Sequence, residues 1–322
     1  MNRINESRVT EFFLLGLSHS QDQKMPLFAL FFLMYLVTLL GNALIVAVIV
    51  SSQELHNPMY FFLGNLSFVD ICFSSVTAPL MLNNLFWDRK SISFEGCISQ
   101  LFFLFCTASM ECFVLAIMAY DRLVAINNPL RYLSIMHRTM CLALIVFSWT
   151  FTSLHSLLHI SIVSSMKFCG PNKIHEYFCD LPPLLALSCS DTSQYDLLVF
   201  TEGSFVTMSP FVFVVISYAR ILNAILKIQS SIGKYQAFST CSSHLTSVGL
   251  FFGTIFFTYF RPSSSDSLEE NRSVTVVYSV LTPLLNPFIY SLRNQQIKVA
   301  VNKIYHRMLR TDVKDICKKK IL

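Results

Sequence analysis

The sequence predicts an all-α membrane protein, a bundle of seven transmembrane helices, and its composition is the first indication. Only 13% of the 322 residues are Asp, Glu, Lys or Arg, whereas a soluble globular domain has about 25%. Hydrophobic residues make up 53% of the chain, and its mean hydropathy is +0.54. A chain so poor in charge must meet a non-aqueous solvent. This excludes a soluble enzyme, an acidic disordered protein and a basic nucleic-acid binder.

The second indication is the spacing of apolar stretches, since the hydrocarbon core of a bilayer requires about 20 apolar residues per helix. Seven stretches qualify, at about 26–50, 58–82, 97–121, 140–163, 196–220, 238–260 and 273–292. The second contains Asp70 and the seventh is broken by Pro283 and Pro287, so these two are the least regular. The period-two alternation of membrane barrel strands is absent, which favours helices.

Basic residues orient the bundle. If the N-terminus lies outside, the inner segments hold 15 of the 24 Lys and Arg residues, as the positive-inside rule requires. We therefore expect an extracellular N-terminal tail at 1–25, a transmembrane domain at 26–292 with a long extracellular loop at about 164–195, and a cytoplasmic segment at 293–322. That last segment is expected to begin with a short amphipathic helix and to continue as a basic tail.

Four cysteines, Cys97, Cys169, Cys179 and Cys189, fall on the extracellular side, where disulfides persist. Four cysteines allow three pairings. We favour Cys97–Cys179 with Cys169–Cys189, because joining the middle loop cysteine to the helix end leaves the outer two to close a hairpin. The N-terminal tail also carries an N-glycosylation triplet at Asn5.

Ionisable groups inside membrane spans are costly and mark function. The spans contain few of them: Asp70, Glu111, the Asp121–Arg122 pair and Glu202. Asp70 and Glu111 lie near mid-span, and with Asn42 they form a predicted mid-membrane polar site. This site can hold a sodium ion or a proton, or it can be a static network of neutral groups. No other cofactor is expected.

Arg122 closes the third span at its inner end. Stepping back along its helix face leads through Leu115 and Glu111 to Ala108 and Leu104. This stripe joins an apolar outer region, a mid-membrane carboxyl group and an inner cation. Such an axis suits a switch that a solute operates.

His155 and His159 stand four residues apart in the fourth span, so both imidazoles lie on one helix face. Two such histidines can share a metal ion. The sequence offers no third ligand nearby. Two packed, neutral histidines are therefore the favoured interpretation, and no metal site is predicted.

Five motifs carry a family resemblance: Pro58–Leu63, Met118–Arg122, Ser217–Tyr218, Phe238–His244 and Pro283–Asn294. Together they resemble the signatures of vertebrate odorant receptors, which are rhodopsin-like class A G-protein-coupled receptors. The Asn-Pro-x-x-Tyr element alone indicates only the broad class. The combination of Met-Ala-Tyr-Asp-Arg with Phe-Ser-Thr-Cys-x-Ser-His is specific to odorant receptors.

The resemblance implies a receptor in the plasma membrane of olfactory sensory cilia. It implies that small, mostly apolar volatile ligands bind a transmembrane pocket, and that the partner is a stimulatory, olfactory-type heterotrimeric G protein that raises cyclic AMP. The ligand would contact the outer thirds of spans three, five, six and seven. The expected contacts, each of which could instead be ordinary helix packing, are Leu104, Phe105, Ala108, Ser109, Glu202, Val206, Phe252, Ile255, Tyr259 and Tyr278.

The resemblance also implies a set of residues that couple to the G protein and switch the receptor: Asp121, Arg122, Tyr218, His244, Asn286, Pro287 and Tyr290. The chain departs from the family pattern at three positions. Leu123 replaces a usual Tyr, Asn127 a common Cys, and Phe252 a usual Tyr. The last change removes a hydroxyl group from the sixth span.

Two alternatives stay open from the sequence. One is a class A receptor outside olfaction, and the other is a seven-helix ion or proton transporter that uses Asp70 and Glu111. An intramembrane enzyme ranks lowest, because the chain contains neither a His-Glu-x-x-His zinc motif nor a Gly-x-Ser-x-Gly nucleophile turn. No catalytic residue and no nucleic-acid partner are predicted.

Overall fold

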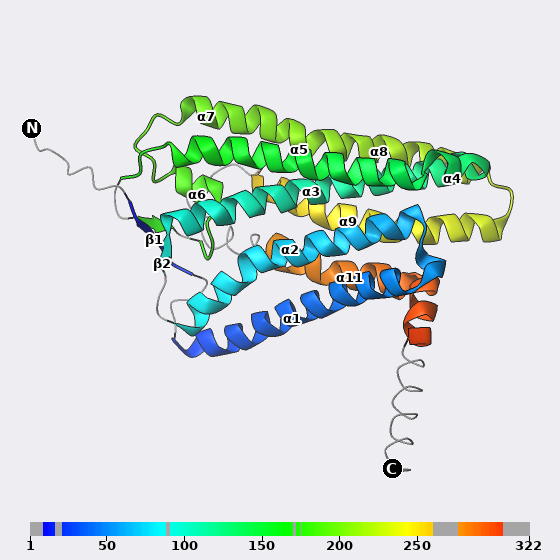
Figure 1. Ribbon diagram of the computed structural model, residues 1–322, viewed down its shortest axis with the longest axis horizontal. Coiled ribbons are helices and arrows are strands. Elements are labelled where there is room, and N and C mark those ends of the chain that lie inside the picture. Colours follow the sequence, from blue (N-terminus) through cyan, green and yellow to red (C-terminus); the bar gives the residue numbers. More distant parts are fainter. Residues whose placement is uncertain are drawn as a thin grey trace, which may run out of the picture.

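The long helices pack along one common axis, with a small sheet at one end of the bundle (Figure 1). The structure, a computed structural model, describes residues 9–16, 21–87, 91–169, 172–174, 176–259 and 276–304. The predicted glycosylation site Asn5 and the tail beyond residue 304 lie outside these residues. We call the end that holds the sheet the sheet end and the other the opposite end.

Among the described residues, five helical stretches are long and apolar enough to cross a membrane. They are α1 (Gln21–Ser51), α2 (Pro58–Phe86), α3 (Phe94–Asn127), α5 (Arg138–Ser164) and the continuous stretch of α7 (Ser193–Leu198), η3 (Val199–Gly203) and α8 (Ser204–Lys227). These helices coincide with the first five predicted spans, and most extend beyond them.

Two further helical segments lie where spans six and seven are predicted. These are α9 (Ser231–Tyr259) and the pair η4 (Val277–Leu281) and α11 (Thr282–Arg293). That these segments cross a membrane stays a prediction. Residues 295–304 are again helical, with Ile297 and Ala300 buried and Lys298 exposed. This is the short amphipathic helix expected after the seventh span.

Capping side chains set two of the helix starts. Asn57 Oδ1 accepts a hydrogen bond from the backbone N–H of Tyr60, and Pro58 occupies the first turn of α2. Ser93 Oγ accepts from Gly96 N–H at the start of α3. Both caps satisfy N–H groups that the first turn of a helix leaves free.

Helix α3 lies at the centre of the bundle and packs against α2, α5, α8 and α9. Its side chains Met110, Val114, Leu115 and Met118 belong to the main hydrophobic core. The predicted stripe behind Arg122 thus faces other helices. Leu115, Glu111 and Leu104 are all buried.

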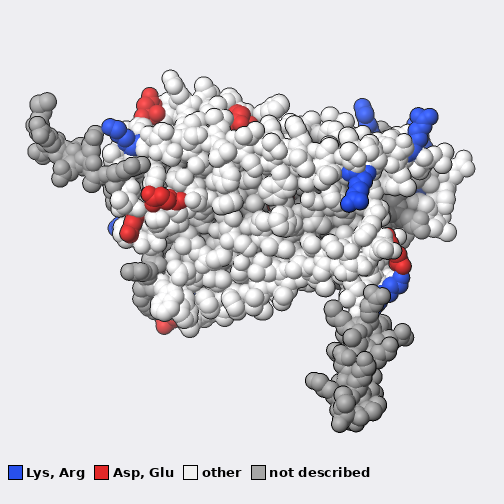
Figure 2. Space-filling model, viewed as in Figure 1, with Lys and Arg blue, Asp and Glu red and all other residues white. Residues whose placement is uncertain are grey.

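The outer faces of the helices are apolar. Leu40, Val50, Phe147 and Phe205 are each at least 64% exposed. Figure 2 shows most charged side chains towards the two ends of the long axis, with few across the middle of the visible face. An apolar girdle between two charged ends is the surface that a bilayer solvates.

A three-stranded sheet closes one end of the bundle, in the order β2, β1, β3. Strand β1 (Glu11–Leu14) pairs antiparallel with β2 (Ser91–Ser93) and parallel with β3 (Lys173–Ile174). Phe12 and Leu14 are fully buried. From the sequence we predict only a tail here and no strand. Glu11–Leu14 forms a strand because two alternate apolar side chains, Phe12 and Leu14, pack under the sheet.

The long segment between α5 and α7 is fixed by both disulfides that the sequence analysis favours, Cys97–Cys179 and Cys169–Cys189. Its short helix α6 (Leu181–Leu185) begins at Asp180, whose carboxylate accepts a hydrogen bond from Leu181 N–H at 2.8 Å. Because Cys179 is bound to the first turn of α3, α6 is held over the sheet end of the bundle.

Candidate functional site

A cavity of about 470 Å³ opens beneath α6. Its walls come from α2, α3, α5, η3, α8 and α9, and α6 forms its roof. Small-molecule sites typically measure about 300–1,000 Å³ and are mostly apolar. The size of this cavity therefore suits a small organic ligand.

Six of the ten predicted ligand contacts line this cavity. They are Leu104, Phe105, Ala108, Ser109, Val206 and Ile255. Four of them follow one another at helical spacing on α3, so a single face of the central helix forms much of one wall. The hydroxyl of Ser109 is one of the few polar groups in the lining.

The other predicted contacts lie elsewhere. Phe252 is not part of the lining and packs against Phe211, with ring centroids 5.1 Å apart, while its neighbour Phe251 faces the cavity. The prediction is displaced by one residue, which turns a helical side chain by about 100°. Glu202 is also absent from the lining. The side chains of Tyr259 and Tyr278 lie outside the described residues.

Sequence reasoning missed the roof of the cavity and part of its wall. Leu181, Pro182 and Leu185 of α6 enclose the cavity from the sheet end, and His155 and His159 of α5 line its side. The Cys97–Cys179 disulfide, which the sequence favours, was the feature from which the roof could have been predicted. A loop joined through Cys179 to the end of α3 must lie over the pocket that α3 lines.

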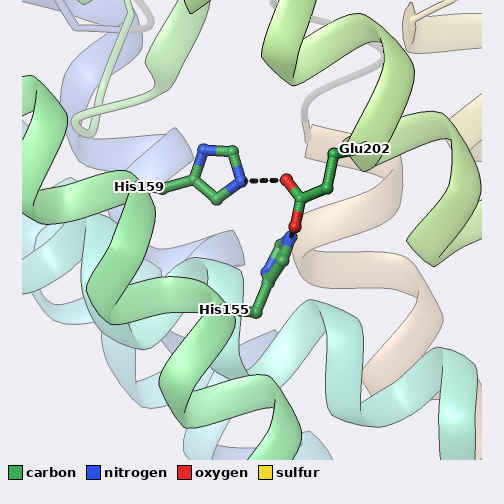
Figure 3. A group of neighbouring side chains, drawn as sticks. All are labelled: His155, His159 and Glu202. Carbon is green, nitrogen blue, oxygen red and sulfur yellow. Dashed lines mark hydrogen bonds and ion pairs between the residues drawn. The ribbon is translucent and has the colours of Figure 1, made fainter.

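His155 and His159 meet Glu202 at this wall, as Figure 3 shows. His155 Nε2 lies 3.1 Å from one carboxylate oxygen and His159 Nε2 lies 2.7 Å from the other. The prediction that no third ligand lies near the two histidines is wrong, because Glu202 meets both of them. Glu202 is separated from them by more than forty residues and reaches them only through the packing of η3 against α5.

The predicted mid-membrane residues are buried. Asn286 Nδ2 donates to both carboxylate oxygens of Asp70, at 3.0 and 3.2 Å. Glu111 is only 2% exposed, and its Oε1 has no hydrogen-bond partner among the described residues. Buried, underused oxygen acceptors of this kind suit a small hard cation or a bound proton.

Asn42 of α1 compensates for a hydrogen bond that Pro287 removes from α11. Pro287 has no N–H group, so the carbonyl oxygen of Pro283, four residues earlier, loses its helical partner. Asn42 Nδ2 donates a hydrogen bond to that oxygen at 3.1 Å. Gly41 brings the two helices close enough, since a Cβ atom there would lie 3.2 Å from the Pro287 ring.

A second cluster of hydrogen-bonded side chains, besides the one at Asp70, lies toward the opposite end of the bundle. His244 Nε2 is hydrogen-bonded to the carbonyl oxygen of Leu115 at 3.0 Å, and Tyr218 lies at its other ring nitrogen. Near the end of α3, Tyr132 donates to Asp121 at 2.7 Å. Within the described residues Arg122 forms no ion pair with Asp121 or another carboxylate. Tyr290 is buried.

The chain resembles known proteins over nearly its full length. The family model described as "Olfactory receptor" matches residues 31–308. Olfactory receptor 1f45 of Rattus norvegicus is 50% identical over 304 residues, which is 94% of this chain and 97% of the relative. The human olfactory receptors 1L3 and 1F1 are 48% and 47% identical, covering 96% of this chain and 95% and 99% of their own lengths.

Proposed function

The chain belongs to the olfactory receptor family, and from this premise we propose a ligand, a topology and a signalling route for it. The family consists of G-protein-coupled receptors and not of enzymes, and its members are multi-pass membrane proteins that respond to odorants.

We propose that the cavity beneath α6 binds small, mostly apolar volatiles by shape and dispersion. The observation that carries this proposal is the largely apolar lining to which Leu104, Phe105, Ala108 and Ile255 contribute. Ser109 can offer one hydrogen bond. A pocket with few polar groups selects ligands by size and outline more than by charge.

The proposed topology has seven spans, with η4 and α11 as the last. The tail at 1–25, the sheet end and the loop at about 164–195 face the outside, whereas 293–322 lies in the cytoplasm. The bias of basic residues towards the inner segments supports this orientation. The proposed location is the plasma membrane of olfactory cilia.

The proposed signalling route runs along α3 to the opposite end. Ligand contact at Ala108 and Ser109 would bias a two-state bundle whose inner face presents Arg122 to a stimulatory G protein, which raises cyclic AMP. Asp121, Tyr218, His244 and Tyr290 lie on or near this inner face, and their hydrogen bonds can rearrange between states. At Asn286 and Pro287, where the helical hydrogen bonding of α11 is interrupted, the helix can bend between the two states.

Asp70 and Glu111 are the proposed site of a sodium ion or a shared proton. Two buried carboxyl groups near one another cannot both ionise without a cation or donors. A cation bound in one state and released in the other would shift the equilibrium by its difference in affinity.

The test is a cyclic AMP reporter in cells that express the full chain, challenged with a chemically diverse panel of volatiles. We expect at least one apolar volatile to raise cyclic AMP, and Arg122→Ala to abolish that response at equal surface expression. An unchanged response of Arg122→Ala would contradict the inner-face assignment. Ligand-dependent ion flux in proteoliposomes without G protein would instead support a transporter.

A further inference from the structure

Three side chains that can ligate a metal converge in the wall of the cavity. His155 and His159 project from successive turns of α5, and Glu202 projects from η3 so that its carboxylate lies between the two rings (Figure 3). One ligand atom from each residue can be chosen so that all three lie within 4.8 Å of one another. The arrangement comes from two separate helices and is therefore a property of the packed bundle.

The local helix geometry aims Glu202 at α5. Glu202 lies in a π-helical turn, Val199–Gly203, between the α-helices α7 and α8. A π-turn inserts an extra residue and redirects the side chains around it, and such turns occur frequently at functional sites. The turn faces the histidine pair, so Glu202 supplies the third ligand that a metal site needs.

His155 is not satisfied by this arrangement alone. Its side chain is only 8% exposed, and among the described residues neither ring nitrogen makes a hydrogen bond of regular geometry, although Nε2 lies 3.1 Å from Glu202 Oε1 as an ion pair. Burying a polar group without a good hydrogen bond is destabilising. A cation placed among the three groups would give His155 Nε2 a partner.

A further side chain fixes the orientation of the second ring. The Tyr195 hydroxyl lies 3.0 Å from His159 Nδ1, on the side of the ring opposite Glu202. When Nδ1–H donates to this hydroxyl, Nε2 carries a free lone pair directed at the cluster. Hydrogen bonds of this kind to the outer nitrogen are the usual support of metal-bound histidines.

We propose that His155, His159 and Glu202 bind a divalent transition metal ion, such as Zn²⁺, through the two Nε2 atoms and the carboxylate. Two imidazoles and one carboxylate match the three protein ligands of sites that leave a fourth position open. Nitrogen donors favour Zn²⁺ over Mg²⁺ and Ca²⁺. Because both histidines line the cavity, the fourth position faces it and is available to water or to a donor atom of a cavity ligand.

The observed spacing is close to what the ion requires. Metal–ligand distances of about 2.0–2.2 Å in a tetrahedral site separate the ligand atoms by roughly 3.3 Å. The two nitrogen–oxygen distances here are 3.1 and 2.7 Å. These two distances run to different carboxylate oxygens, and one ligand atom from each residue lies within 4.8 Å of the other two. A rotation of the Glu202 side chain, which is 30% exposed, would bring a single oxygen to both nitrogens.

The test is Zn²⁺ titration of the purified, full-length receptor by calorimetry, without any odorant. We compare His155→Gln, His159→Gln and Glu202→Gln with the matched control His56→Gln, which removes an exposed histidine elsewhere. The wild type and the control should bind one more Zn²⁺ than each of the three variants, or bind it at least about 10–100-fold more tightly. Equal stoichiometry and affinity in all five proteins would overturn the proposal.

Tyr195→Phe keeps the test decisive if a ligand variant fails to fold. This change leaves all three ligands in place and should weaken Zn²⁺ binding by about 10–100-fold, and Co²⁺ bound in the same site should change its visible absorption spectrum. An unchanged affinity and spectrum in folded Tyr195→Phe would place the bound ion away from His159 and overturn the proposal. Since no odorant is involved, either result leaves the proposed receptor function to its own test.

Discussion

The hydroxyl of Tyr218 in α8 lies 2.8 Å from Nδ1 of His244 in α9. Because the other ring nitrogen faces the carbonyl oxygen of Leu115, which can only accept, Nε2 carries the proton and Nδ1 accepts from Tyr218. One neutral histidine thus joins α3, α8 and α9 near the end of the bundle that holds Arg122. Movement of α9 away from α3 would break these hydrogen bonds.

We predict that His244→Phe raises basal cyclic AMP several-fold. Phenylalanine fills a similar volume but removes two hydrogen bonds, each worth about 0.5–1.5 kcal/mol, that hold the helices in the arrangement seen here. The measurement is reporter signal without ligand at matched surface expression. Thr246→Val, which removes only a hydrogen bond within α9, is the control and should not change the signal. A basal signal in His244→Phe equal to the control would show that this link does not hold the resting state.

We predict that Ala108→Phe abolishes the response to an active volatile. The larger ring would occupy a cavity of about 470 Å³ that Ala108 helps to line. The measurement is the cyclic AMP dose–response curve, which should lose its amplitude or shift by at least about tenfold, equal to 1.4 kcal/mol. Val212→Phe adds bulk to the exposed outer face of α8 and should leave the curve unchanged. A full response from Ala108→Phe would place the ligand elsewhere.

We predict that Gly41→Val destabilises the receptor by about 1–3 kcal/mol, the usual cost of overpacking. The first added atom alone would lie 3.2 Å from the Pro287 ring and would push α1 from α11. Thermal unfolding of purified protein measures the effect. Gly249→Val provides the comparison, since among the described residues nothing lies within 4 Å of where a Cβ atom of residue 249 would be. Equal melting temperatures of the two variants would refute the close contact.

We predict that the loop over the cavity loses stability as pH rises. Burial raises the pKa of Asp180 to about 6 from its ordinary 3.8, although the hydrogen bond from Leu181 opposes this. The folded loop therefore holds the proton more tightly than the unfolded loop. The stabilising contribution is complete below pH 3.8 and disappears as pH rises through about 6.

The measurement is the melting temperature of the wild type and of Asp180→Asn between about pH 4 and pH 7. The variant should lose the part of the pH dependence that falls in this window. Asp191→Asn is the control, because hydrogen bonds from Ser193 lower the pKa of that exposed carboxyl group and place its effect below pH 3.8. Identical curves for the wild type and Asp180→Asn would contradict the assignment.

One wall of the cavity could be predicted because its residues are neighbours on a single helix, α3. Leu104, Phe105, Ala108 and Ser109 lie on one face of α3, and the position of one predicts the others. Phe252 was also predicted, but it lies outside the lining of the cavity, whereas its neighbour Phe251 is part of it. Periodicity predicts which residues share a face but does not fix which face meets the pocket.

The sequence by itself determined the apolar helices, the cysteines available for the outer loop and the family motifs, because each depends on residues close together in the chain. Only the tertiary structure decided which distant groups meet. It placed α6 over the cavity, Asn42 against the free carbonyl of Pro283, and Glu202 between His155 and His159. Contacts between helices depend on how the helices rotate and pack, and no local pattern encodes that rotation.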